Sequence, residues 1–449
     1  MKEQFFESLK LSLPLIIAQL AQLGLGLTDT LMIGWYGTTE LAALTLGHAC
    51  IFFVYISITG FSLGVIAKVS EAYGSGNLDL VRLNVRMGVW LVLFFSILGI
   101  VILANTKVIL YLFNQEPNLI EVINGYISII IWMLPFILLT YVFKAFLISV
   151  NKERIVLIIS VFGLISNIFL NYLFIFGNLG MPELGLKGAA IASLGSSFLM
   201  LTSAIFYSHF SDIKRFQLFT NFFVFDQKVF FQLLKIGWPI CLTIMAESGM
   251  FSTAPIFMGW IGEAQLAAHG IVMIIFAFFF MIPLGISQAG TVRVAKTIGK
   301  KKISEIGRVA LSIYGLGLSW AVINTLIIVL FGGNIINLFI DHDNLNANLV
   351  IFYASSYLIV CCMFHIADSG QILFAAILRG FSDTKMPFGI SLFSYWIVGV
   401  PTAYYLSQHT DLLGLGIYLG IGIGLLVATI LLFYRYLLIK KITVLNLLT

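Results

Sequence analysis

Charged side chains are scarce in this chain of 449 residues. Asp, Glu, Lys and Arg make up 10% of it, whereas soluble domains carry about 25%. Cysteine is scarce as well: there are four, without CxxC spacing, which indicates neither a zinc site nor a disulfide framework. No G-x-x-x-x-G-K-[ST] stretch occurs, which excludes nucleotide hydrolysis by the P-loop route. These shortages argue against a soluble domain and against a P-loop enzyme.

Hydrophobic residues dominate instead. They form 60% of the chain, and the mean hydropathy is +1.03. Apolar runs of about 20 residues or more recur throughout, each long enough to cross about 30 Å of hydrocarbon. We therefore predict an all-α integral membrane protein with twelve spans, at residues 11–34, 44–67, 87–106, 122–143, 155–176, 188–208, 236–260, 266–292, 309–331, 350–378, 386–407 and 413–436. The charged start MKEQFFESLK has no small-residue cleavage site, so no removable signal peptide is expected.

The basic residues indicate how these spans are oriented. With the N-terminus in the cytoplasm, only Lys107 and Lys187 of the 25 Lys and Arg fall in outside loops. This asymmetry follows the positive-inside rule, and one missed helix would disturb it. Both termini are therefore predicted to be cytoplasmic. The lysine run at 300–302 is interpreted as a topology signal beside lipid head groups, and no nucleic-acid partner is expected.

The sequence repeats itself at half its length. GWYGTTELAA at 34–43 matches GWIGEAQLAA at 259–268, so the offset between the copies is half the chain. The same offset, without a gap, pairs Gly60 with Gly285. Internal repeats of this size are typical of secondary transporters.

The repeat predicts the domain organisation. Six spans in each half return the chain to the side on which it began, so the halves are predicted to be parallel. We expect two six-helix bundles related by a pseudo-two-fold axis along the membrane normal. The predicted domains are an N-lobe at 1–208, a cytoplasmic linker at 209–228 and a C-lobe at 229–449.

Two carboxylates are predicted to lie near the middle of the membrane. Glu247 is twelve residues from Lys235, which places it about 18 Å above the inner boundary. Asp368 is eleven residues before Arg379, which places it about 16 Å above the same boundary. Asp29 is expected nearer the outside. Ionisable residues at such depths face cavities and mark ion or substrate paths.

The residues around Glu247 suit a small hard cation or a proton. Thr243, Ser248 and Ser252 offer hydroxyl oxygens, and hard cations prefer oxygen ligands. Removal from water favours the neutral form of a carboxylate, so the pair could equally carry a proton. A structural alternative is a neutral, hydrogen-bonded acid or an ion pair, for which Lys144 is the only candidate lysine within a span. The residues leave Na⁺ and H⁺ both open.

Several stretches together resemble the multidrug and toxic compound extrusion (MATE) family, in its NorM-like branch. The similarity extends over essentially the whole chain. The stretches that carry it are GLTDTLMIG, LNYLFIFG followed by MPELGLKGAAIA, GWPICLTIMAES, AAHGI, ADSGQILFAAILRGFSDTK and YWIVGVPTAYYL. The resemblance implies a twelve-helix exporter with two six-helix bundles, driven by inward flow of Na⁺ or H⁺.

The resemblance also implies functional residues. Glu247 and Asp368 would form the cation site of the C-lobe, with no other metal site expected. Some relatives add a tyrosine to that site, which the sequence does not place here.

In the N-lobe, the resemblance implies a polar cluster of Asp29 with Asn167, Asn171 and Ser193. Asn171 stands where another branch of the family carries an aspartate, so that branch's proton scheme does not transfer directly to this chain.

We expect a cation-coupled antiporter that exports amphipathic, often cationic compounds, with no cofactor besides the coupling ion. It would be a monomer in contact with lipid, in a bacterial inner membrane. One alternative is a flippase for lipids or lipid-linked precursors from the same superfamily. The other is an intramembrane aspartyl enzyme using Asp29 and Asp368, for which no catalytic motif is present. His48, His269 and His365 lack the spacing of metal ligands, so we expect them to pack or to make a hydrogen bond.

Overall fold

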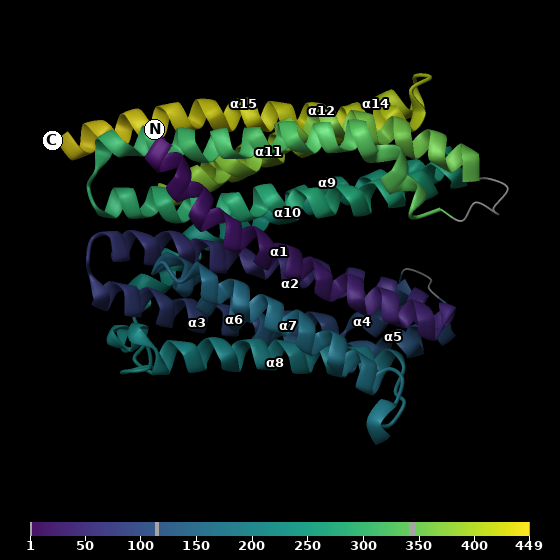
Figure 1. The fold of residues 1–449 in the computed structure, drawn as a ribbon, viewed down its shortest axis with the longest axis horizontal. Helices are drawn as coiled ribbons and strands as arrows, with labels where there is room; N and C mark the ends of the chain where they lie inside the picture. The colour runs from purple at the N-terminus through teal and green to yellow at the C-terminus, as the bar shows by residue number, and fades with distance from the viewer. Residues whose placement is uncertain (1, 113–115, 341–346, 449) are drawn as a thin grey trace. The chain divides into compact units, whose positions relative to one another are not determined.

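The computed structural model describes residues 2–112, 116–340 and 347–448, and all regular structure in these ranges is helical (Figure 1). Eleven helical segments are long and apolar enough to cross a membrane, and one bent pair of helices makes a twelfth if it is a single span. The predicted all-α membrane fold is confirmed. The elements are α1 (Lys2–Tyr36), α2 (Thr38–Gly74), α3 (Leu78–Ala104), α4 (Thr106–Leu112), α5 (Pro117–Ile130), α6 (Met133–Ser149), α7 (Glu153–Phe174), η1 (Asn178–Gly180), α8 (Leu186–Phe210), η2 (Asp212–Phe216), α9 (Gln227–Ile261), α10 (Glu263–Gly299), α11 (Ile303–Asn337), α12 (Ala347–Gly380), α13 (Lys385–Leu392), η3 (Phe393–Gly399), α14 (Val400–Gln408) and α15 (Leu413–Leu448).

The bent pair is α5 and α6, which cover the fourth predicted span. Their axes differ by 45° across a short break. Pro135 lies in the first turn of α6 and has no N–H to donate to the carbonyl of Ile131, four residues earlier. A proline ring also clashes with that carbonyl. The bend therefore has a local cause in the sequence.

The eleventh predicted span contains a π-helical stretch, η3, between α13 and α14. In η3 the N–H of Val400 bonds the carbonyl of Tyr395, five residues earlier. Pro401 follows at once and cannot donate a hydrogen bond back into the preceding turn. Short π-helical turns are rare and occur often at functional sites.

The internal repeat is present in the fold. α1 and α9 begin at Lys2 and Gln227 and end at Tyr36 and Ile261, so both pairs of ends are separated by the offset found in the sequence. α2 and α10 are related in the same way. Packing repeats as well, because the contacts of α2 with α3 and α6 correspond to those of α10 with α11 and α12.

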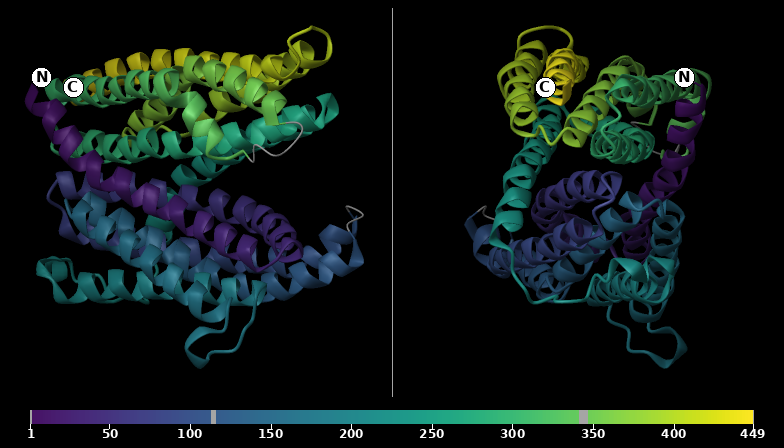
Figure 2. Two further views of the ribbon diagram at one scale, coloured as in Figure 1. Left: turned by 45° about the vertical axis from the view of Figure 1, so that its right-hand side comes forward. Right: turned by 90° about the vertical axis from the view of Figure 1, so that its left-hand side faces the viewer.

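The chain divides into two compact units. The N-terminal unit is Ile17–Cys241, and the C-terminal unit combines Met1–Ile16 with Leu242–Thr449. The first turns of α1 thus belong with the second half of the chain, and Figure 2 shows them (purple) beside the green helices of that unit. These units share most, though not all, of their residues with the predicted lobes.

Two glycines allow close packing of helices. Gly60 of α2 lies against the first half of α9, and Gly285 of α10 lies against the first half of α1. A Cβ on Gly60 would lie 2.6 Å from the backbone nitrogen of Cys241, and a Cβ on Gly285 would lie 2.8 Å from the Cα of Ile16. Each pair lies within one unit, and the repeat offset relates one pair to the other. No other residue would fit at either glycine without a shift of backbone. The repeat thus reproduces a backbone contact as well as the helix boundaries.

The stretch between α8 and α9 is fixed onto the N-terminal unit. The ring of Phe216 in η2 lies 5.3 Å from that of Phe146 and 6.2 Å from that of Tyr73. Arg86 donates a 2.6 Å hydrogen bond to the carbonyl of Asn221. The predicted linker at 209–228 is therefore packed against α2, α3 and α6.

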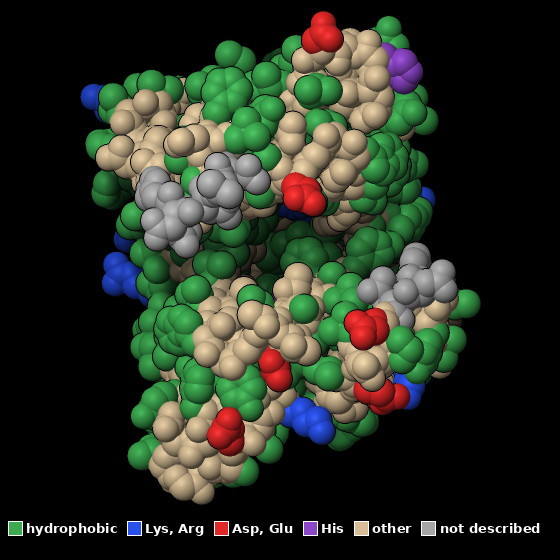
Figure 3. Space-filling view, turned by 90° about the vertical axis from the view of Figure 1, so that its right-hand side faces the viewer, with side chains coloured by type: hydrophobic (Ala, Val, Ile, Leu, Met, Phe, Trp, Pro, Cys, Tyr) green, Lys and Arg blue, Asp and Glu red, His purple; other side chains and the backbone are tan. Residues whose placement is uncertain are grey.

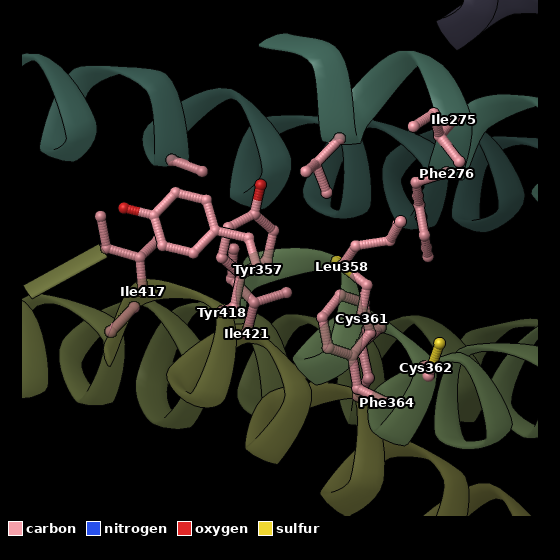
Figure 4. Close-up of a cluster of buried hydrophobic side chains, with 14 of the residues drawn as sticks. Ile275, Phe276, Tyr357, Leu358, Cys361, Cys362, Phe364, Ile417, Tyr418 and Ile421 are labelled. Atoms are coloured by element: carbon pink, nitrogen blue, oxygen red, sulfur yellow. The ribbon is translucent and has the colours of Figure 1, made fainter. Parts of the chain in front are cut away.

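In the C-terminal unit, α12 packs against α10, α11 and α15. Figure 4 shows part of the resulting core, in which side chains of α12 face Phe276 of α10 and Tyr418 of α15. The ring of Phe364 lies 5.6 Å from that of Phe276 and 6.3 Å from that of Tyr418. Every residue of α12 from 367 to 378 is buried. The most enclosed helix of this unit therefore carries Asp368.

Hydrophobic side chains cover much of the surface, and charged ones are sparse on the face seen in Figure 3. Large exposed apolar side chains include Phe94 and Ile97 on α3 and Val329 and Leu330 on α11. A soluble monomer rarely exposes apolar patches of this extent. Such a surface fits contact with lipid.

Candidate functional site

The structure brings the four predicted polar residues of the N-terminal unit together. Asp29, from α1, accepts hydrogen bonds at Oδ1 from Asn171 at 2.6 Å and from Asn167 at 3.1 Å. Its Oδ2 accepts a 2.6 Å hydrogen bond from the hydroxyl of Ser193 on α8. We call these residues the Asp29 cluster. All three partners act as donors, as a carboxylate removed from water requires.

The Asp29 cluster is closed to solvent but keeps one free acceptor. Asp29 is 3% exposed, and Asn167 and Asn171 are completely buried. Asn171 also donates to the side-chain oxygen of Asn167 at 3.2 Å, while its own Oδ1 has no hydrogen-bond partner among the residues that the structure describes. Buried polar atoms are rarely left unpaired. This amide oxygen can therefore accept a hydrogen bond, such as that of a protonated carboxyl, or contact a small cation.

The two predicted carboxylates of the C-terminal unit share one donor. Gln371, one turn after Asp368 on α12, donates from Nε2 to Oε1 of Glu247 at 2.7 Å. The same Nε2 lies 3.4 Å from Oδ1 of Asp368. Asp368 is completely buried and Gln371 is 2% exposed, whereas Glu247 is partly exposed. We call Glu247 and Asp368 the carboxylate pair.

One oxygen of the carboxylate pair lacks a partner. Oδ2 of Asp368 is buried and makes no hydrogen bond with the described residues. A buried carboxylate oxygen without a donor is costly, and a proton or a cation at this oxygen would remove that cost. Two carboxylates with neutral oxygens nearby match the ligands of a hard cation. The residues present therefore fit either a small hard cation or a proton.

Sequence reasoning missed Gln371 and Tyr395. The hydroxyl of Tyr395, on η3, donates to Oε1 of Gln371 at 2.9 Å, so a tyrosine does enter this site, through the glutamine. Gln371 carried a signal, because it is the only amide within one turn of Asp368 in an otherwise apolar and small run. Tyr395 carried none, since its direction depends on the π-helical turn.

Of the hydroxyls predicted around Glu247, that of Ser252 has another partner in the structure. Ser252 bonds the backbone carbonyl of Ser248 instead. Lys144, the lysine weighed as an ion-pair partner, lies in the N-terminal unit, 5.6 Å from the centre of the Tyr141 ring. The basic group that does attract Glu247 is Arg379, near the end of α12. Glu247 is thus paired with an amide and attracted by a more distant guanidinium.

The histidines fit the expectation of packing or hydrogen bonding. His269 Nδ1 lies 2.7 Å from the Tyr418 hydroxyl, and His48 packs against the ring of Tyr126. His365 packs edge-on against Phe276. The four cysteines are free thiols. Within the described ranges, no three side chains of His, Cys, Asp or Glu form a group that could hold a metal ion.

Comparison with known proteins adds to this geometry. The model of the MatE family matches residues 14–173 and 239–405, which together cover most of the chain, and the starts of the two matches are separated by the repeat offset. The chain belongs to the MatE family. The membership agrees with the resemblance found in the sequence.

Relatives of this MatE chain align over nearly its full length. It is 35% identical over 433 residues to a "Probable multidrug resistance protein NorM" of Rhizobium meliloti, covering 96% of this chain and 93% of the relative. A protein with the same description from Agrobacterium fabrum is 34% identical, with 97% and 94% covered.

A solved structure shows the same fold. It is described as an outward-facing conformation of a multidrug resistance MATE family transporter of the MOP superfamily. The TM-score is 0.88 at 19% identity, with 98% of this chain and 96% of the other covered. The predicted twelve-helix MATE fold is confirmed.

Proposed function

We propose that this MatE chain is a secondary active multidrug exporter, which moves small amphipathic and often cationic compounds out of the cell in exchange for Na⁺ or H⁺. The descriptions of its relatives as multidrug resistance proteins support the class of substrate. The observation that carries the coupling is the carboxylate pair: two acidic groups bridged by one amide, with a buried Asp368 oxygen that has no donor.

Coupling follows from competition between two conformations. A cation bound at the carboxylate pair stabilises one conformation, and a bound substrate stabilises another. Each ligand can shift the equilibrium only by the difference between its affinities for the two conformations. Inward flow of the cation then drives outward movement of the substrate. The protein would work as a lipid-embedded monomer in a bacterial inner membrane, with both termini in the cytoplasm and no catalytic step.

Reconstituted transport tests this function. The purified protein is placed in liposomes, and export of the fluorescent cation ethidium is followed under a Na⁺ gradient at equal pH, and separately under a pH gradient without Na⁺. One or both gradients should drive dye movement in the wild type, and neither should do so in Glu247→Gln. A rate of dye movement that is independent of both gradients would contradict the proposal, and so would a Glu247→Gln variant as active as the wild type.

The same liposomes separate the exporter from a flippase. A fluorescent phospholipid added to one leaflet should stay there at the rate of protein-free liposomes. Gradient-driven movement of the phospholipid, without movement of the dye, would favour the flippase instead.

A further inference from the structure

We propose that Gln371 is a third ligand of the coupling cation, recruited by a half-turn of its side-chain amide when the cation reaches the carboxylate pair. The inference rests on the function proposed above and adds a residue to its cation site. In the structure the amide presents its N–H group to both carboxylates. After the half-turn it would present its oxygen to the cation.

The present orientation is one that a bound cation cannot share. Nε2 lies 2.7 Å from Oε1 of Glu247 and 3.4 Å from Oδ1 of Asp368, so its hydrogens occupy the space between the two carboxylates. The amide N–H is the positive end of its dipole and repels a cation placed on the same oxygens. Gln371 is buried and helical on α12, so its backbone cannot withdraw readily. A half-turn about the last side-chain bond removes the conflict and exchanges a donor for an acceptor.

The other end of the amide can accommodate the half-turn. Oε1 now accepts from the hydroxyl of Tyr395 at 2.9 Å. After the half-turn Nε2 would face that hydroxyl. The hydroxyl must then accept a hydrogen bond from Nε2 and donate its own hydrogen bond to another acceptor. Ser391 lies one helical turn earlier, its side chain interacts with that of Tyr395, and its buried Oγ has no well-formed hydrogen bond. Ser391 Oγ can therefore accept a hydrogen bond from the Tyr395 hydroxyl in the cation-bound state.

Both orientations thus give the Gln371 amide and the Tyr395 hydroxyl hydrogen-bond partners, which is the condition for a two-state switch. Without the cation, the Tyr395 hydroxyl donates to Gln371, and the amide donates to the carboxylates. With the cation, the amide donates to Tyr395, and Tyr395 donates to Ser391. For a proton the same half-turn applies, because the O–H of a protonated Asp368 that points to Gln371 would donate to the amide oxygen and would not face an N–H.

Ser391→Ala distinguishes this switch from a fixed bridge. Ser391 is needed only in the turned state, so its loss should weaken cation binding by about tenfold, the effect of one buried donor left unpaired. If Gln371 only holds the carboxylates in place, the Ser391 hydroxyl has no part in cation binding. Ser394→Ala is the matched control: Ser394 is completely buried, lies beside Tyr395, and has an equally unpartnered Oγ. It should bind the cation within about twofold of the wild type.

The experiment has two arms, which separate the two coupling ions. In the first, radioactive Na⁺ binding to the purified protein is titrated at fixed pH. In the second, without Na⁺, the pH dependence of ethidium export is measured, and a tenfold loss of proton affinity moves its midpoint by about one pH unit. Gln371→Met, which keeps length but offers neither N–H nor C=O, should weaken binding, and Ser391→Ala should add nothing in that background. All variants are first compared with the wild type in thermal unfolding.

The outcomes are separable. Equal affinities for Ser391→Ala, Ser394→Ala and the wild type would overturn the switch while leaving the carboxylate pair as the coupling site. Binding by Gln371→Met as tight as that of the wild type, or tighter, would overturn it too, because the amide would then be only an obstacle. A wild type that responds to neither ion, or a Glu247→Gln variant that responds normally, would overturn the proposed function and this inference together.

Discussion

Asn171 donates a 2.6 Å hydrogen bond to Oδ1 of Asp29, although the two residues are 142 positions apart in the chain. In the Asp29 cluster one carboxylate has three donors, whereas in the carboxylate pair two carboxylates share one donor. The repeat offset does not relate these two sites to each other, because Asp29 corresponds to Ala254 and Glu247 corresponds to Gln22. Two units of the same fold therefore handle acidic groups differently, and we expect their variants to behave differently.

Glu247→Gln should leave the fold intact and abolish gradient-driven export. The amide keeps the shape of the side chain and loses the charge that a cation or a proton needs. Ethidium efflux from cells, at matched expression, measures the loss. Glu263→Gln, at the exposed start of α10, is the control and should export normally. Efflux by Glu247→Gln at the wild-type rate would exclude Glu247 from coupling.

The losses from Glu247→Gln and Asp368→Asn should not add. Both residues contact the same amide nitrogen, so removing either already disrupts a shared cation site. A double-mutant cycle on cation affinity should give a coupling energy well above the roughly 0.3–0.5 kcal/mol within which independent sites add. Additive losses would place the two carboxylates in separate sites.

Asp29→Asn should uncouple transport while preserving substrate binding. The substitution supplies a permanently neutral side chain at the centre of the Asp29 cluster, so the cluster can no longer change its charge during the cycle. Ethidium affinity should stay close to that of the wild type, because asparagine keeps the size and shape of the Asp29 side chain. Gradient-driven export should be lost. Export at the wild-type rate would make Asp29 a structural hydrogen-bond partner only.

Gly285→Ala and Gly60→Ala should each lower the thermal stability. The added methyl group would lie within 3 Å of backbone atoms of Ile16 or Cys241, and overpacking of this kind costs about 1–3 kcal/mol. Gly315→Ala on α11 is the control, because a Cβ there meets nothing within 4 Å and alanine favours helix by about 1 kcal/mol. Unfolding in detergent, followed by loss of the monodisperse elution peak, measures all three. Equal Tm values would show that the helices can separate without cost.

The ion pair between Lys152 and Asp212 should make a small, pH-dependent contribution to stability. Lys152 donates to Asp212 at 2.6 Å, and this hydrogen bond lowers the pKa of the Asp212 carboxyl and raises the pKa of the Lys152 ammonium. Because the folded pKa of Asp212 is lowered, the ion pair stabilises the fold at pH values above the unfolded pKa of about 4. This contribution is lost as the pH falls through the folded pKa. The raised pKa of Lys152 stabilises the fold at pH values below the unfolded value of about 10, and this contribution is lost only as the pH rises through the folded value.

Asp212→Asn should therefore have a slightly lower Tm than the wild type at pH 7, and the difference should shrink between pH 4 and the lowest pH at which both proteins stay folded, both of which are measured. Asp411→Asn, in the exposed loop before α15, serves as the control and should leave Tm unchanged at both values. A difference that persists in acid would mean that Asp212 acts through its shape and not through its charge.

The fold was largely predictable because it depends on length, composition and repetition. Apolar runs of sufficient length located the spans, and the offset between the stretches at 34–43 and 259–268 predicted the repeated helices. The break between α5 and α6 was not predicted. A single proline is compatible with an unbroken apolar run, so hydropathy alone does not reveal the bend.

The candidate sites were predictable only in part. Glu247 and Asp368 stood out because an ionisable residue within an apolar membrane span indicates an ion or substrate path. Gln371 and Tyr395 did not, since a neutral amide and a tyrosine are common in helices, and their contact requires α12 and η3 to be placed side by side. The direction of the Tyr395 side chain further depends on the π-helical turn before Pro401. The periodicity of hydrophobic residues assumes a regular α-helix and therefore does not predict such a turn.

The division of α1 and α9 between the two units has a consequence for biosynthesis. The C-terminal unit includes residues 1–16, which are made long before the rest of that unit and must remain unassembled until α10, which carries Gly285, has been translated and inserted. The N-terminal unit is incomplete until Cys241 has left the ribosome, so it cannot assemble fully when α8 has been made. Two fragments separated at the 209–228 stretch would each lack a piece held by the other, and would have to be produced together to fold.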